Sequence, residues 1–146
     1  MKIICHGSID VPLSIIENAE TIKFDNYKTN TPAIFQIRQL GEFDTSLMNN
    51  LADIVGVDIH KLDYVYFSVC NGAEPHTDLL DPLKFEDRTF VIPVILPKGK
   101  STITAEDERK VAELNHIYEF NHERVHSMEL EDTNSGCVVI MVAVKK

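Results

Sequence analysis

The chain has 146 residues, enough for one domain with a sizeable hydrophobic core, and its apolar and charged fractions are ordinary. Its net charge of −9 argues against duplex nucleic acid or an anionic membrane as a partner, because either needs a basic surface. No apolar run approaches the roughly 18–20 residues of a membrane span, and the opening "MKII" is too short for a signal-peptide core. Cys5, Cys70 and Cys137 lie far apart without a C-x-x-C motif, which indicates reduced thiols. We therefore expect a single domain over residues 1–146, located in the cytoplasm.

The first sixty residues predict two short strands and one helix. Residues 2–5 and 33–40 have the composition of strands, whereas the polar segment between them allows no assignment. Residues 44–56 predict a helix that Asp44 or Thr45 can cap. Its apolar stripe consists of Leu47, Leu51, Ile54 and Val55.

The chain from residue 62 onward is typical of β-structure. Two of its segments, 88–96 and 137–144, are almost continuously apolar, which is typical of strands buried on both faces. Pro93 lacks an N–H group, so it belongs at an edge or a bulge. Residues 106–114 fit a helix by composition or a hairpin arm by context. The further expected strands are 62–69, 101–105 and 116–121. Regularly spaced short strands predict a mainly β fold, a sandwich or jelly roll.

The segment "HERVH" at 122–126 spells H-E-x-x-H, the zinc signature of many metalloproteases. In that site His122 and His126 bind the ion from one helix face, and Glu123 is the general base. After His126, however, Met128 and Leu130 alternate with polar residues, which is the period of a strand. No third ligand follows at protease spacing. A zinc protease and a pair of surface histidines in a polar turn remain as alternatives.

A second set of residues predicts a different metal site. His76 and Asp78 form H-x-D, and on an extended chain their side chains point to the same side. His126 lies on the inward face of its own expected strand. Two histidines and one carboxylate occupy one face of an octahedral ion and leave its other positions open, as in the facial triad of non-heme Fe(II) oxygenases. We therefore expect His76, Asp78 and His126 to bind Fe(II).

These motifs resemble the Fe(II)- and 2-oxoglutarate-dependent dioxygenases, in particular small prolyl and aspartyl/asparaginyl hydroxylases. "YVYFSV", the turn at Gly72 and "EPHTD" match the run into the H-x-D motif, and "IYEFN" precedes the distal histidine. The resemblance covers roughly residues 62–144. It implies a double-stranded β-helix, a jelly-roll variant, with the helix at 44–56 packed outside the major sheet and the strand at 137–144 closing the barrel.

The resemblance also implies 2-oxoglutarate and O₂ as cosubstrates, with one departure from the family. The basic residue that usually holds the distal carboxylate of 2-oxoglutarate is missing near Gly136 and Cys137. A buried carboxylate without a partner is costly. Arg88 is our first candidate for the cation because its planar fork matches a carboxylate, although a surface pair with Glu86 or Asp87 would fit equally. The other candidates for cosubstrate contacts are Lys98, Lys100 and, as a hydrogen-bond donor, Tyr66.

The sequence thus predicts an Fe(II)- and 2-oxoglutarate-dependent oxygenase that hydroxylates a protein side chain or a small molecule. We expect no catalytic side chain beyond the metal ligands. The missing basic residue favours one alternative, a jelly-roll binding or structural module that keeps the triad without activity. The substrate cannot be deduced from the sequence, and the segments 6–32 and 79–87 are expected to frame the mouth of the pocket.

Overall fold

The computed structural model describes residues 2–22, 33–36 and 45–146, with only the backbone of 33–36. The expected strand residues 37–40, the expected cap Asp44 and residues 23–32 of the pocket mouth lie outside this part of the chain. The helices are α1 (Leu13–Glu20) and α3 (Thr45–Val55), with a 3₁₀ turn at Ile59–Lys61. The strands are β1 (Ile3–Ser8), β2 (Ala33–Gln36), β3 (Leu62–Cys70), β4 (Ala73–His76), β5 (Phe85–Ile95), β6 (Ser101–Ala105), β7 (Glu108–Val111), β8 (His116–Phe120), β9 (His126–Leu130) and β10 (Cys137–Lys145).

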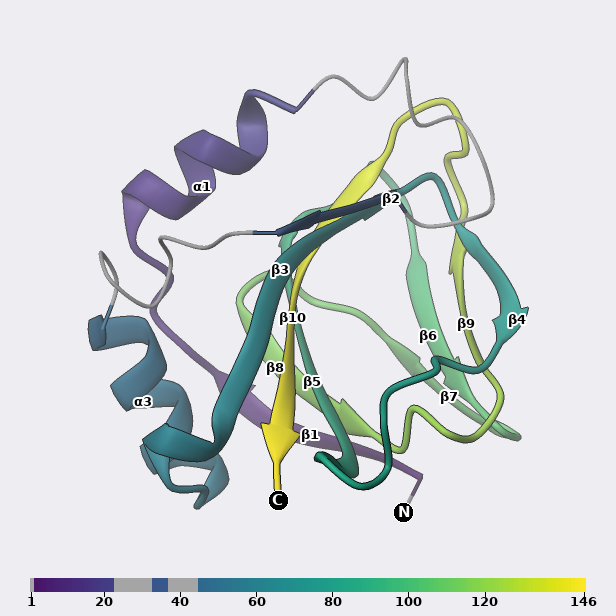
Figure 1. Cartoon of the computed structure of the whole chain (residues 1–146). Helices are drawn as coiled ribbons and strands as arrows, with labels where there is room; N and C mark the ends of the chain where they lie inside the picture. The colour runs from purple at the N-terminus through teal and green to yellow at the C-terminus, as the bar shows by residue number, and fades with distance from the viewer. Residues whose placement is uncertain (1, 23–32, 37–44) are drawn as a thin grey trace.

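The strands form two antiparallel sheets that face each other (Figure 1). The six-stranded sheet has the order β1-β8-β5-β10-β3-β2, and the four-stranded sheet has the order β4-β9-β6-β7. From β3 to β10 the chain crosses repeatedly between the sheets, so that most neighbours in each sheet are distant in sequence, with the β6–β7 hairpin as an exception. This is the topology of a jelly roll. The predicted mainly β fold is confirmed.

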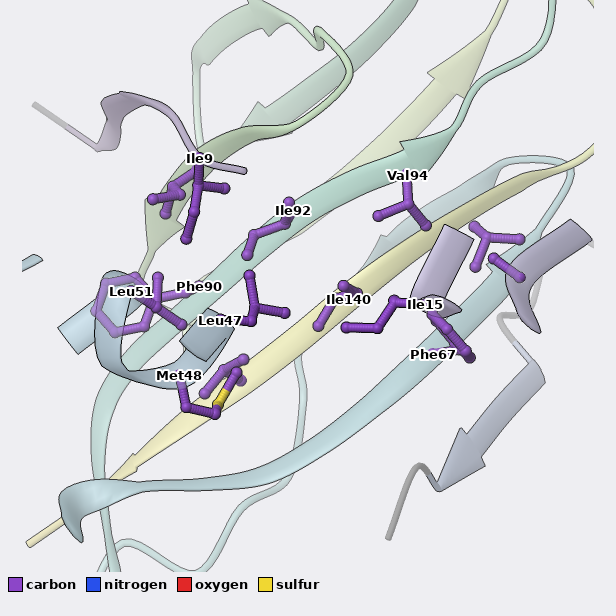
Figure 2. Close-up of a cluster of buried hydrophobic side chains, with 14 of the residues drawn as sticks. Ile9, Ile15, Leu47, Met48, Leu51, Phe67, Phe90, Ile92, Val94 and Ile140 are labelled. Carbon is purple, nitrogen blue, oxygen red and sulfur yellow. The ribbon is translucent and has the colours of Figure 1, made fainter. Parts of the chain in front are cut away.

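Both helices pack on the outer face of the six-stranded sheet, away from the four-stranded sheet (Figure 1). Ile15 of α1 and Leu47 and Leu51 of α3 are almost fully buried, and they contact a layer of sheet side chains that includes Phe90 and Ile140 (Figure 2). Each such side chain contributes about 1.5–3 kcal/mol through burial. The expectation of a helix packed outside the major sheet is therefore confirmed.

Strand β10 is covered on both faces, which explains its continuous apolar run. It lies between β5 and β3 in the middle of the larger sheet. Val138, Ile140 and Val142 face the helices, whereas Val139 and Met141 face the second sheet. Pro93 of β5 lies where the register between β5 and β10 shifts, so the bulge expected for this residue is confirmed.

Three local features differ from the sequence-based prediction or were left open by it. The unassigned segment contains α1, which begins after Pro12. Residues 106–114 form a hairpin arm rather than a helix, because β7 pairs with β6. In α3 the buried stripe includes Met48, while Ile54 is 40% exposed. Within the described residues, no helix is long and apolar enough to cross a membrane.

Candidate metal centre

A cavity of about 240 Å³ lies between the two sheets. Its walls come mainly from the inner faces of β3, β5 and β10 on one side and β4, β6 and β9 on the other. Most of the lining side chains are apolar, and three of the polar ones, His76, Asp78 and His126, lie close together. Among the described residues, the lining consists of Tyr66, Ser68, Cys70, Ala73, His76, Asp78, Val91, Ile103, Phe120, His126, Ser127, Met128, Val139 and Met141.

The structure brings His76, Asp78 and His126 together at this cavity. His76 ends β4, Asp78 follows it in the loop, and His126 begins β9, directly opposite His76 in the ladder. One ligand atom from each side chain lies within 4.8 Å of the others. The Nε2 atom of His126 is 3.1 Å from Asp78 Oδ2, and that of His76 is 3.4 Å from Asp78 Oδ1. The three predicted ligands therefore converge on one point.

Both imidazole rings are held so that Nε2 faces this point. The Nδ1 atom of His76 lies 2.6 Å from the carbonyl oxygen of Glu74, and Nδ1 of His126 lies 2.9 Å from that of Arg124. When Nδ1–H donates to a carbonyl, a neutral ring carries its lone pair on Nε2, which is the usual arrangement of metal-binding histidines; a proton on His126 Nε2 that bonds to Asp78 has to leave before a metal binds. Phe120 packs against the His126 ring at a centroid distance of 4.6 Å and restricts its rotation further.

Asp78 is held in place through its backbone and remains ionised. Its amide donates a 2.9 Å hydrogen bond to the carbonyl oxygen of His122, which ties the H-x-D loop to the turn before β9. Burial alone would raise the pKa of Asp78, but the hydrogen bond with His126 and the nearby histidines lower it below its usual value. An ionised carboxylate beside two neutral imidazoles is the donor set that Fe(II) oxygenases use.

His122 and Glu123 do not join this site. Residues 122–125 form a turn, not a helix, so the geometry that an H-E-x-x-H zinc site requires is missing. The His122 ring is 1% exposed and its Nδ1 lies 2.8 Å from the Thr89 hydroxyl, while Glu123 points to solvent. His122 is thus neither a ligand here nor the surface histidine of the other alternative.

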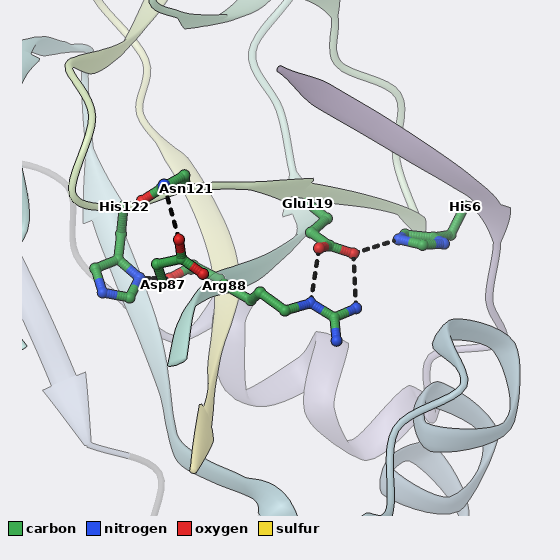
Figure 3. A network of polar contacts seen from close by, with 7 residues as sticks. His6, Asp87, Arg88, Glu119, Asn121 and His122 are labelled. Atoms are coloured by element: carbon green, nitrogen blue, oxygen red, sulfur yellow. Dashed lines mark hydrogen bonds and ion pairs between the residues drawn. The ribbon is translucent and has the colours of Figure 1, made fainter. Parts of the chain in front are cut away.

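Arg88 lies on the opposite face of the sheet from the cavity. It shares the strand parity of Phe90, and its guanidinium stacks over that ring at 5.4 Å. Figure 3 shows its two hydrogen bonds to Glu119, at 2.8 and 3.2 Å, and the contact of Glu119 with His6 at 2.8 Å. Strand alternation therefore directs Arg88 away from the triad, and the structure gives its predicted contact with 2-oxoglutarate no support.

The two lysines are also remote, and Tyr66 alone of the predicted cosubstrate residues lines the cavity. Lys98 and Lys100 are exposed in the loop after β5. Burial, with the negative charge of Asp78, raises the pKa of Tyr66, so its hydroxyl keeps its proton and can donate it in a hydrogen bond. Beside it, Tyr64 has a φ of +54° at a register shift between β3 and β10, and its ring packs on Tyr66 at 5.1 Å. This bulge helps to fix the Tyr66 ring.

Sequence analysis missed several cavity residues, notably Ser68, Cys70, Phe120 and Ser127. For two of them a signal was available, since Ser68 and Cys70 share the strand parity of Tyr66. Ser127 carried no such signal, because it has the parity opposite to that of His126. Ser68 and Ser127 supply hydroxyl groups and Cys70 supplies a thiol, while the described lining contains no Lys or Arg.

The eight strands β3–β10 and the triad between their sheets define a double-stranded β-helix with a candidate facial-triad metal site. The crystal structure of a prolyl 4-hydroxylase from Pseudomonas putida matches the chain with a TM-score of 0.61, covering 99% of this chain and 92% of that one at 10% sequence identity. No protein-family model and no curated protein matches the sequence. The predicted resemblance to Fe(II)- and 2-oxoglutarate-dependent dioxygenases is thus confirmed at the level of the fold.

Proposed function

We propose that this protein is an Fe(II)- and 2-oxoglutarate-dependent oxygenase that hydroxylates a protein side chain or a small molecule. The observation that carries the proposal is the convergence of His76, Asp78 and His126 within 4.8 Å at the wall of an interior cavity. The fold it shares with a prolyl 4-hydroxylase supports the same assignment. The zinc-protease alternative has no such support, because residues 122–125 are not helical.

In this proposal the two Nε2 atoms and the Asp78 carboxylate hold the metal. When bound, Fe(II) supplies the means to activate O₂ and to decarboxylate 2-oxoglutarate, which provides the oxidising power for C–H hydroxylation. Before metal binds, the hydrogen bond with His126 lowers the pKa of Asp78, and a bound cation would favour the ionised carboxylate in its place. The carbonyls of Glu74 and Arg124 keep Nε2 of each histidine directed at the site.

The rest of the cavity orients the organic molecules and limits water. Phe120, Val91 and Met141 are among the apolar side chains that line the same cavity as the triad, so a reacting C–H group would meet a mainly apolar wall. This wall favours an uncharged or apolar part of a substrate near the metal. The partner we propose is therefore a small-molecule cosubstrate, O₂ and a substrate that presents an apolar group.

The fit to 2-oxoglutarate itself is partial. The hydroxyls of Tyr66, Ser68 and Ser127 are the donors that the described lining offers to the distal carboxylate. Each hydroxyl gives the carboxylate one hydrogen bond and no positive charge, less than the two charge-assisted bonds of an arginine fork. We therefore expect 2-oxoglutarate to bind weakly, with hydroxyl contacts in place of an ion pair.

Oxygen consumption tests the proposal directly. The full-length protein is mixed with Fe(II) and 2-oxoglutarate, and both O₂ uptake and succinate are measured, with Asp78→Ala as the inactive control. We expect slow uptake that requires both additions and yields succinate. Metal binding without any such uptake over a wide range of 2-oxoglutarate concentrations would contradict the proposal.

The cation-free lining of the described cavity favours a second candidate, a jelly-roll module that binds metal and an apolar ligand without turnover. Both candidates predict metal binding through the triad. They differ in their binding of 2-oxoglutarate, because the oxygenase would bind it at the metal and the module would not. A titration of 2-oxoglutarate into the Mn(II)-loaded protein separates them.

A further inference from the structure

Two cysteines face each other at the wall of the cavity. Cys70 ends β3 and Cys137 begins β10, and the two residues are direct partners in the ladder between these strands. Their sulfur atoms are 3.6 Å apart. Directly opposed residues of antiparallel strands have Cα atoms about 4.5–5.5 Å apart, which lies within the span of about 4.4–6.8 Å that a disulfide bridges.

The two thiols have different environments. Cys70 lines the cavity and is 5% exposed, whereas Cys137 is fully buried behind it. The hydrogen bond from Cys137 lowers the pKa of the Cys70 thiol below its ordinary value, and the same bond together with burial raises that of Cys137. A thiolate is the reactive form of cysteine. Cys70 is therefore the nucleophile that a small molecule in the cavity can reach, with Cys137 behind it.

The pair lies among apolar side chains, and the third cysteine is not near it. Cys137 also lies 3.8 Å from the sulfur of Met128, a cavity residue, and the pair packs among apolar side chains that include Leu130. Cys5, by contrast, is exposed on β1, outside this cluster. No disulfide links the three cysteines, since all are free thiols.

We propose that Cys70 and Cys137 form a peroxide-sensitive dithiol that closes reversibly to a cross-strand disulfide at the wall of the triad cavity. The ligand class is a hydroperoxide, with hydrogen peroxide as the simplest member. This proposal concerns thiol chemistry and does not depend on the oxygenase activity proposed above.

The reaction balances in two steps. The Cys70 thiolate attacks one oxygen of hydrogen peroxide, the O–O bond breaks, and the leaving hydroxide takes a proton to give the first water and a sulfenic acid on Cys70. The Cys137 thiol then loses its proton and attacks the Cys70 sulfur, which forms the S–S bond and releases the second water. Two sulfurs are oxidised and the two oxygens of the peroxide are reduced. A dithiol reductant reverses the change.

Closure of the disulfide would alter the cavity rather than the metal ligands. A disulfide bond of about 2.05 Å would draw together two sulfur atoms that are now 3.6 Å apart, which would move the Cys70 sulfur away from the cavity. The link fastens β3 to β10, which already pair within the six-stranded sheet. His76 and His126 lie on the other sheet, so metal binding should survive oxidation while the shape of the cavity changes.

The test is a thiol-mapping experiment on the full-length chain, with a chelator present so that bound iron cannot drive oxidation. The reduced protein is treated with one equivalent of hydrogen peroxide, and the remaining thiols are alkylated under denaturing conditions. Proteolysis and mass spectrometry then locate every cysteine. We expect the wild type to lose two of its three thiols, to yield a peptide that links Cys70 to Cys137, and to recover both thiols with dithiothreitol.

Matched variants separate the roles of the three cysteines. Cys5→Ser should behave as the wild type does. Cys137→Ser should form no link and should accumulate a sulfenic acid on Cys70 that dimedone traps, while Cys70→Ser should leave Cys137 reduced. Thermal melts show whether each variant folds. If a serine variant does not fold, the linked peptide found in the wild type still tests the proposal. Oxidation confined to Cys5, or over-oxidation of Cys70 without a link in the wild type, would overturn the proposal.

Discussion

The two faces of the six-stranded sheet are built from the same strands but serve different purposes. On the outer face, Phe90, Ile92 and Ile140 are fully buried against the helices (Figure 2). On the inner face, Val91 and Met141, their neighbours in sequence, line a cavity of about 240 Å³. One residue along a strand therefore separates a side chain that stabilises the fold from one that borders the site.

Charged groups follow the same division. On the outer face Arg88 is engaged by Glu119, which His6 also contacts (Figure 3). On the inner face Tyr66 and Ser68 offer uncharged hydroxyls. In this comparison Arg88 and Glu119 on the outer face support the sheet, whereas the hydroxyls of Tyr66 and Ser68 on the inner face are available to a ligand.

The largest effect is expected from a truncation on the packed face. Phe90→Ala should lower the free energy of unfolding by about 3–5 kcal/mol, because it leaves a cavity under the helices. Val91→Ala, one residue away on the inner face, should cost only about 1.5 kcal/mol, the value of two methylene groups. Chemical denaturation measures both. If Val91→Ala lowered the unfolding free energy as much as Phe90→Ala does, although it removes a smaller side chain, the inner face would be packed at least as tightly as the outer one.

Arg88→Ala tests whether this charged side chain stabilises the outer face or binds the cosubstrate. We expect a loss of about 1–2 kcal/mol in unfolding free energy, because Glu119 loses a bidentate partner that is itself partly exposed. The affinity for 2-oxoglutarate should not change. A clear drop in that affinity, measured by calorimetry on the Mn(II)-loaded protein, would return Arg88 to the cosubstrate site.

Tyr66→Phe changes the inner face by one hydroxyl. Removal of one hydrogen bond to a carboxylate, about 1.5 kcal/mol at the lower end of its usual range, should weaken 2-oxoglutarate binding roughly tenfold. Stability and metal affinity should stay near those of the wild type, since the ring remains. The same calorimetric titration measures this variant, and unchanged cosubstrate affinity would remove Tyr66 from the binding residues.

The smallest effect concerns acid stability on the outer face. Burial alone would raise the pKa of Glu119, but hydrogen bonds from Arg88 and His6 lower it below its usual value of about 4.3. A carboxylate with a lowered pKa stabilises the fold above its unfolded pKa, and this contribution disappears as the pH falls through the folded pKa. Glu119→Gln should therefore cost about 1 kcal/mol near neutral pH, and the gap from wild type should narrow below about pH 4. Denaturation curves across this pH range measure the difference in unfolding free energy between the two proteins. A difference that does not change with pH would contradict a lowered pKa of Glu119.

Much of the β-fold could be predicted because most strands after residue 61 carry a clear pattern. The expected strands 62–69 and 101–105 differ from β3 and β6 by no more than one residue at either end. The convergence of the candidate metal ligands could be predicted for the same reason, since His126 shares the parity of Met128 and Leu130 on a half-polar strand. Parity decides the face of a strand wherever polar and apolar residues alternate.

The position of Arg88 could not be predicted in this way. Strand β5 is apolar on both faces, so its sequence carries no alternation that would say which face meets the cavity. Helix α1 was missed for a related reason. Leu13 is 68% exposed while Ile15 and Ala19 are buried, so its apolar residues do not mark the packed side. Tertiary contacts decided both cases.

Metal titration tests the central claim most directly. Mn(II), which resists oxidation in air, is titrated by calorimetry into the wild type, Asp78→Ala, and two controls, Asp81→Ala in the same loop and Glu123→Gln in the turn before β9. We predict that the wild type binds one ion per chain. Asp78→Ala should lower the affinity by more than about 100-fold, because the loss of a ligand should exceed the 10–100-fold effect of losing a supporting contact. Both controls should keep an affinity within a few-fold of the wild type. Undiminished binding by Asp78→Ala, or loss of binding in Glu123→Gln, would contradict the assignment of the site to His76, Asp78 and His126.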